Sequence, residues 1–264
     1  MIYKRVAARL RAQDWVAITI EIVIVIIGVF VGTWVANWNQ QRAERRDIDQ
    51  LLFQMRPELA RIRVAGQVRL NYYGTTRHFA DIALAGWTRD PGVSDRDFVV
   101  AAYQASQITG ISKGSPLVTA VLGADQVRKI GDPALRTALL RVINFSYDAI
   151  DATAMQTRYR EDVRQTIPDD IQQAVRRACG DRPVANGMLV LPTSCRVAIA
   201  PARAAAGAAE LRAHPELVRE LRFHLSQVAN FEFNSGELGN RVATLERLID
   251  AKFGAKVAKP AGFG

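Results

Sequence analysis

The sequence predicts an all-α protein: one N-terminal transmembrane helix, then an elongated helical bundle with a small irregular or hairpin loop at 180–197. Residues 15–38 are apolar almost throughout, and the apolar residues of the remaining chain recur at steps of three and four. This spacing puts side chains on one face of a helix. We divide the chain into a basic leader at 1–14, the transmembrane helix at 15–38, a helical domain at 39–253 and a flexible tail at 254–264.

The stretch 15–38 has the length and composition of a membrane-spanning helix. Between Val16 and Ala36 lie 21 residues whose only charge is Glu21. At ~1.5 Å per residue they extend about 31 Å, enough to cross a bilayer core of about 30 Å. Tryptophan prefers the headgroup level of a membrane, and it stands near both ends of the stretch as Trp15, Trp34 and Trp38.

One face of this helix collects its small and polar residues. At about 100° per residue, Glu21, Gly28 and Gly32 lie within about 20° of one line, with Ala36 about 60° away. Gly28 and Gly32 form a G-x-x-x-G match, which lets a second helix approach closely. We expect this face to associate with another transmembrane helix. The alternative is a chance spacing, since glycine is common in membrane helices.

Glu21 lies about 7–8 Å inside the span from Val16, where a charged carboxylate costs about 2–3 kcal/mol. Its place on the same face as the two glycines favours contact with a partner helix. The alternative is a shallow acid that reaches back to the membrane interface.

A cleaved signal peptide is the competing interpretation of the apolar stretch, because Lys4, Arg5, Arg9 and Arg11 precede it. The apolar run exceeds the roughly 7–15 residues of such a signal, and no pair of small residues marks a cleavage point near 33–38. We therefore expect an uncleaved anchor.

The net charge of +9 is spread along the chain. The arginines stand beside acids rather than in one cluster, and no nucleic-acid-binding motif accompanies them, so we expect no nucleic-acid partner. The abundance of arginine and alanine indicates a bacterial source. Four basic residues precede the span and four follow within twenty positions. The denser leader favours a cytoplasmic N-terminus in the inner membrane and a periplasmic C-terminal domain.

The two cysteines, Cys179 and Cys195, flank one irregular loop. A disulfide between them would stabilise the fold by about 3 kcal/mol and would require an oxidising compartment such as the periplasm. The alternative is two unrelated thiols in a cytosolic domain.

The first half of the soluble part predicts several helices. An amphipathic pattern over 40–85 is kinked at Pro57 and ends at the turn cluster 87–92. Ser94 caps the next helix, with Asp97 three residues on. Helix starts are also expected at 115–116, after a glycine-containing break, and at 132–133, from which a helix runs to about Gln165.

The second half predicts a short helix from Pro168 to Cys179, an extended segment at 188–191 and a helix at 200–213. Its longest pattern, at 215–253, has close to a heptad spacing typical of a coiled coil, and Gly236 and Gly239 do not end it. We expect this helix to pair antiparallel with 40–85.

The opening of the chain resembles a family of bacterial single-pass membrane proteins that carry a domain of unknown function. The matching residues are Glu21, the Gly28-Val-Phe-Val-Gly32 run and Asn37-Trp38-Asn39. The segment 122–136 is similar to a second, looser pattern of that family. The resemblance implies membrane anchoring and a helical body, and it implies no particular activity.

Candidate catalytic residues are few. Gly110-Ile-Ser112-Lys-Gly114 matches the G-x-S-x-G nucleophile motif, but it lacks the preceding strand that a hydrolase of this type needs. His78, His214 and His224 show no metal-binding spacing, and His224 falls on the apolar face of the last helix as a half-buried histidine. We expect no cofactor, no metal and no enzyme activity.

The function we expect is association: the transmembrane face binds a second copy or another membrane protein, and the bundle meets a periplasmic partner. The alternative is a bundle that senses a ligand and signals through a partner membrane protein. A membrane-anchored serine hydrolase using Ser112 is a remote alternative.

Overall fold

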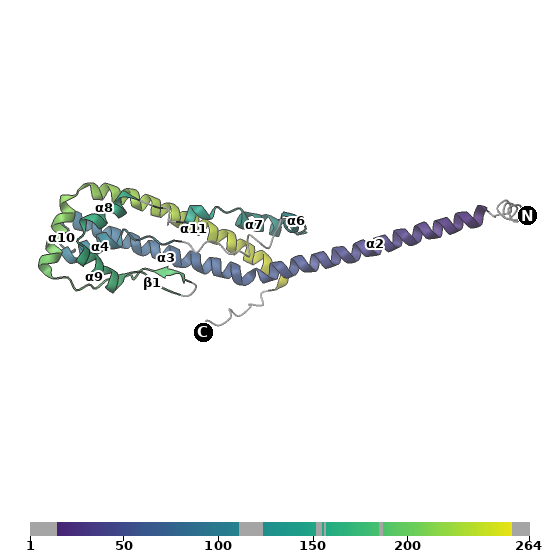
Figure 1. Ribbon diagram of the computed structural model, residues 1–264, viewed down its shortest axis with the longest axis horizontal. Coiled ribbons are helices and arrows are strands. Elements are labelled where there is room, and N and C mark those ends of the chain that lie inside the picture. The colour runs from purple at the N-terminus through teal and green to yellow at the C-terminus, as the bar shows by residue number, and fades with distance from the viewer. Residues whose placement is uncertain (1–14, 111–123, 152–154, 156, 185–186, 255–264) are drawn as a thin grey trace, which may run out of the picture. The chain divides into compact units, whose positions relative to one another are not determined.

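The computed structural model describes residues 15–110, 124–151, 155, 157–184 and 187–254 (Figure 1). The chain forms two compact units, Met1–Leu51 and Leu52–Gly264. The described residues are overwhelmingly helical, with one pair of two-residue strands. The predicted all-α class is confirmed.

The described part of the first unit is most of helix α2 (Trp15–Gln54), which is apolar in its first half. Its large apolar side chains are exposed all round the helix, for example Ile24 at 63% and Phe30 at 70%. Among the described residues, this is the one helix long and apolar enough to cross a membrane, with a mean hydropathy of 2.3 over 18 residues and none of them buried. The helix continues past Trp38, where the guanidinium of Arg42 lies 3.7 Å from the indole centroid.

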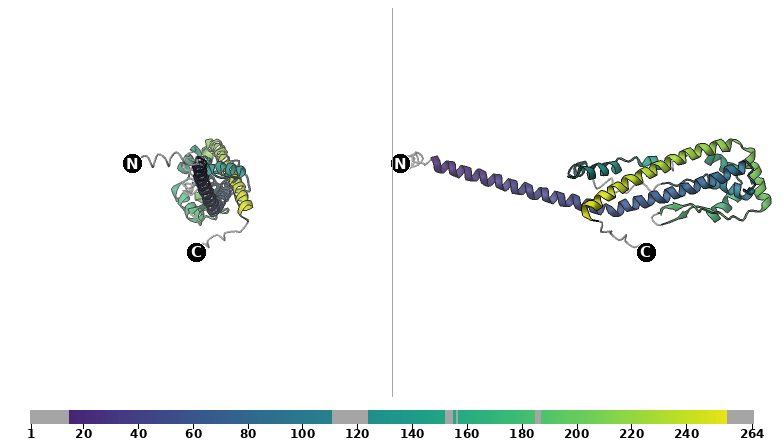
Figure 2. Two further views of the ribbon diagram at one scale, coloured as in Figure 1. Left: turned by 90° about the vertical axis from the view of Figure 1, so that its right-hand side faces the viewer. Right: turned by 180° about the vertical axis from the view of Figure 1, so that it is seen from behind.

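The second unit is built on two long helices, α3 (Arg56–Trp87) and α11 (Glu216–Phe253). They run antiparallel and side by side, as Figure 1 and the right-hand view of Figure 2 show. Ion pairs tie them together at 2.8, 3.1 and 2.6 Å, in order along α3: Arg56–Asp250, Arg63–Glu246 and Arg77–Glu232. The antiparallel pairing predicted for these segments is confirmed over α3, which begins just before Pro57 as the proline predicts.

Shorter helices cover the two long ones. Around the C-terminal half of α3 lie α4 (Asp95–Gln104), α8 (Arg158–Thr166), α9 (Asp169–Cys179) and α10 (Pro201–Ala213). Along α11 lie α6 (Ala124–Arg128), α7 (Pro133–Ile143) and the 3-10 turn η1 (Tyr147–Ile150). Ser94 accepts a hydrogen bond from the Asp97 amide, and Asp132 accepts two from the start of α7, as their cap positions predict.

One helix prediction is wrong. The helix predicted from 133 to about Gln165 ends at Ile143, and η1 and an irregular stretch separate it from α8. Asn144, Ser146 and Asp148 follow that end, and such short polar side chains compete with helical hydrogen bonding of the backbone. The helix start predicted at 115–116 and the tail at 255–264 lie outside the described residues.

The loop after α9 contains the predicted hairpin. Strand β1 (Arg182–Pro183) pairs antiparallel with β2 (Leu189–Val190), with Arg182 opposite Val190.

Close packing of α3 against α4 depends on a glycine. The Phe98 ring lies over Gly86 and meets the Trp87 ring edge-on, with 5.0 Å between their centroids. A Cβ added at Gly86 would lie 2.8 Å from the Phe98 Cβ, and closer still to the ring. Phe98 is fully buried, so it has no room to retreat.

Replacing Gly86 with alanine is therefore expected to lower the free energy of unfolding by about 2–3 kcal/mol through overpacking. Gly74→Ala is the matched control on the same helix, since nothing lies within 4 Å of a Cβ there. That control is expected to stabilise the protein by about 0.5–1 kcal/mol. Urea unfolding followed by circular dichroism measures both, and equal effects of the two substitutions would contradict this packing.

Candidate functional site

The predicted association face lies on the exposed part of α2. Glu21, Gly28, Gly32 and Ala36 are all exposed. A Cβ built at Gly28 or at Gly32 meets nothing within 4 Å, so both positions are open to an approaching helix. Thr33 is occupied within the helix, because its hydroxyl donates to the Val29 carbonyl at 2.9 Å.

Cys179 and Cys195 form a disulfide, with 5.4 Å between their Cα atoms. The bond ties the buried end of α9 to the far side of the hairpin. The Gln104 amide donates to the Cys179 carbonyl at 2.8 Å, so the same point is also held to the end of α4. The loop 180–194 is thereby fixed to the core at both ends.

The three histidines weighed as candidates in the sequence lie apart from one another in the described structure. Ser112 lies outside the described residues, and the residues before Gly110 form helix α4 and a non-helical exit rather than a strand. His78 is exposed on α3, His214 ends α10 and His224 is buried in the core. The described residues contain no group of three or more His, Cys, Asp or Glu side chains placed to hold a metal ion.

The segment that leaves α4, residues 105–109, is buried although it is not helical. Its backbone carbonyls accept hydrogen bonds from side chains on other helices: Ser106 from Arg160 at 2.6 Å, Ile108 from Tyr72 at 3.3 Å, and Thr109 from Tyr73 at 3.0 Å. Buried backbone groups require such partners, because an unpaired one costs about 1–3 kcal/mol.

The side chain of Asp181 extends this network. The Tyr72 hydroxyl also donates to Asp181 at 2.9 Å. Burial raises the pKa of Asp181, while its contact with Tyr72 and the nearby Arg160 and Arg164 oppose that rise. Arg164 donates to the Ser106 hydroxyl and to the Gln107 side chain at 3.1 and 3.0 Å. These polar groups form hydrogen bonds with one another, so we assign the network a structural role rather than a catalytic one.

His224 lies next to this network, and the prediction that it is half-buried is wrong. It is fully buried rather than half-buried, because the neighbouring helices close over this part of α11. Its Nδ1 is 2.7 Å from the Thr157 hydroxyl. Its Nε2 has no hydrogen-bond partner of ordinary geometry, although the Ala105 backbone is close enough to favour the protonated form. Burial, with the nearby Arg160, lowers the pKa of His224 to about 4.

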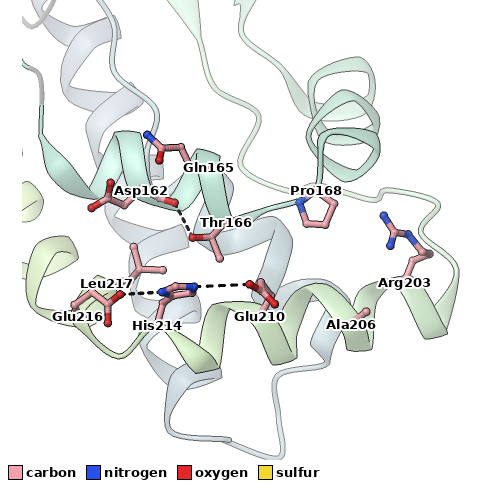
Figure 3. Close-up of a pocket in the computed structure, with 10 residues that line it drawn as sticks. All are labelled: Asp162, Gln165, Thr166, Pro168, Arg203, Ala206, Glu210, His214, Glu216 and Leu217. Atoms are coloured by element: carbon pink, nitrogen blue, oxygen red, sulfur yellow. Dashed lines mark hydrogen bonds and ion pairs between the residues drawn. The ribbon is translucent and has the colours of Figure 1, made fainter.

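A polar pocket of about 610 Å³ opens between α8 and the turn from α10 to α11 (Figure 3). His214 sits between two carboxylates: its Nδ1 is 2.8 Å from Glu216, and its Nε2 is 3.7 Å from Glu210. The hydrogen bond to Glu216 raises the pKa of His214. Arg203, at the rim, is paired with Asp170 at 2.6 Å. The charged groups of His214 and Arg203 are thus paired within the protein.

A second pocket, which we call the basic groove, has a volume of about 400 Å³. It lies where the end of α3 meets the turn from α10 to α11. Its lining combines apolar surface with three arginines and one threonine: Leu84, Trp87, Thr88, Arg89, Arg212, Pro215, Val218 and Arg222. Sequence patterns did not reveal this groove. They marked 87–92 as a turn and Pro215 as a helix start, but gave no sign that the two meet.

Arg89 has an unusual backbone at the edge of the groove. Its φ is 59°, the one positive φ of a non-glycine residue in the described chain. The amides of Arg89 and Asp90 donate to the carbonyls of Gly86 and Ala85, which is the Schellman ending of a helix. Glycine is the usual residue at this left-handed position, and a side chain there costs about 1 kcal/mol.

No protein-family model matches the chain, and comparisons with curated proteins and with solved structures found no similar protein. The resemblance of the opening motif to a membrane-protein family therefore stays an expectation.

The lowered pKa of His224 predicts how stability depends on pH. The unfolded chain takes up a proton near pH 6.5 and the folded chain only near pH 4, so the unfolded state binds more protons between these values. The free energy of unfolding is expected to fall by about 3 kcal/mol as pH drops through this window. His224→Asn keeps a polar atom at the Nδ1 position and removes the titration.

Urea unfolding at pH 4.5, 5.5 and 6.5 tests this effect as the difference between the two proteins, and His78→Asn serves as the exposed control. The same pH dependence in wild type and His224→Asn would show that His224 does not cause it.

Proposed function

We propose that this protein is a single-pass inner-membrane protein of bacteria that acts by association. In this proposal α2 crosses the bilayer, its face of Glu21, Gly28, Gly32 and Ala36 binds a second transmembrane helix, and the unit 52–264 lies in the periplasm. The observation that carries the proposal is the exposure of the apolar part of α2. Such a surface is unstable in water and suits a bilayer.

Two further features support the arrangement. The disulfide between Cys179 and Cys195 suits an oxidising compartment. The polar and charged face of the second unit, with its surface ion pairs, suits an aqueous one. In this arrangement α2 contacts the lipid bilayer, and one face of it contacts a second copy or another membrane protein.

The basic groove favours a second candidate function, in which the bundle binds a small ligand and signals through a partner membrane protein. Neither candidate function involves catalysis.

The topology is tested by fusing reporters after Gly264 in the full chain. Alkaline phosphatase, active only in the periplasm, is expected to be active, and a cytoplasmic green fluorescent reporter is expected to be dark. Non-reducing electrophoresis after thiol blocking should then find no free cysteine. The opposite reporter result would place the second unit in the cytoplasm and remove the periplasmic part of the proposal.

Association is tested with the double variant Gly28→Ile, Gly32→Ile in a membrane dimerisation assay. The added side chains prevent close helix approach, so the dimer signal is expected to drop at least fivefold. The matched control is Val23→Ile, Phe30→Ile on the opposite face, which should keep the signal. An unchanged signal in the glycine variant, with both proteins inserted at equal levels, would overturn the assigned face.

A further inference from the structure

We propose that the basic groove binds a small organic carboxylate with an apolar ring or chain. The body would lie against Trp87 and Val218, and the carboxylate would be held by Arg89 and Arg222. This inference concerns the second unit alone and does not depend on association in the membrane, so the two proposals fail separately.

One part of the groove is an apolar surface formed by three side chains. Leu84, Trp87 and Val218 are each only partly buried, so they present surface to the groove. The one polar atom of Trp87 is engaged elsewhere, because its ring nitrogen donates to the Leu211 carbonyl at 3.1 Å. The indole therefore offers its apolar surface to a ligand, and flat rings pack well against it.

The three arginines of the groove are not equivalent. Arg212 is already neutralised: it pairs with Asp95 at 2.8 Å, donates to the Gly86 carbonyl at 3.2 Å and lies over the Phe98 ring. Arg89 and Arg222 are exposed, and neither forms an ion pair within the described part of the chain. Two uncompensated guanidinium groups thus border the apolar surface. Guanidinium is the side-chain group best matched to a carboxylate, which it binds with two parallel hydrogen bonds.

Arg89 is held where glycine would be favoured. At a left-handed position that ends a helix, glycine gives the most stable fold. A residue that keeps a charged side chain there loses stability, and strained backbones of this kind gather at ligand-binding positions. Binding of an anion at this edge of the groove would account for the arginine.

The residues that line the groove limit the classes of ligand that could bind there. Inorganic phosphate would meet the arginines but leave the apolar wall uncovered, and a neutral apolar molecule would leave the arginines without a partner. Cations are repelled. The volume of about 400 Å³ suits a compact molecule, since small-molecule pockets measure roughly 300–1,000 Å³. An organic anion with one apolar ring system satisfies all of these conditions.

The test uses the full chain in lipid nanodiscs, with 2-naphthoate as the probe and equilibrium dialysis against empty nanodiscs as the blank. Saturable binding of 2-naphthoate is expected, with binding of the neutral isostere 2-naphthamide at least tenfold weaker. Equal binding of the amide, or complete displacement of 2-naphthoate by equimolar inorganic phosphate, would overturn the proposal.

Two substitutions locate the site. Arg222→Gln is expected to weaken 2-naphthoate binding about tenfold. Arg247→Gln, with the same loss of charge farther along α11, should leave binding unchanged. Arg89→Gly is the sharper variant, because it should raise the thermal unfolding midpoint while weakening binding about tenfold. Unchanged binding in both groove variants, or equal weakening in the Arg247 variant, would contradict the assignment.

Discussion

The contact between α3 and α11 is the interaction on which the second unit depends. Each helix carries a buried stripe along its length, from Leu59 to Ala83 on α3 and from Leu217 to Ile249 on α11. Full burial of each large apolar side chain contributes about 1.5–3 kcal/mol. Helix α4 and its neighbours add their side chains to the same core, and Phe98 of α4 packs directly against Gly86 of α3.

The core of the bundle contains a non-helical segment whose backbone needs hydrogen bonds from side chains. Residues 105–109 leave α4 within the core, and the tyrosines and arginines of α3 and α8 supply the hydrogen bonds that a helix would have provided internally. His224 lies close to these groups and is held neutral by burial. The result is a core whose stability depends on pH as well as on apolar packing.

The two candidate sites have opposite chemistry. The face of α2 is apolar with one acid, which suits the interior of a bilayer and a second helix. The basic groove lies in the second unit and combines guanidinium groups with an indole surface. A protein that associates through one and binds an anion at the other would join two separable activities, each with its own variants.

The local pattern of residue types determined most of the secondary structure of this protein. The apolar helix, the glycine face, the caps at Ser94 and Asp132, the hairpin and the long helix at 215–253 follow from spacing and residue type, because short-range sterics and hydrogen bonding govern them. The end of α7 was missed because several short polar residues act together there. Tertiary structure alone decided the full burial of His224 and the presence of Arg89 and Arg222 in the lining of one groove. His224 contacts Thr157, 67 positions away, and Arg89 and Arg222 lie on separate helices or helix ends of the groove; only the packing of whole helices brings such residues together.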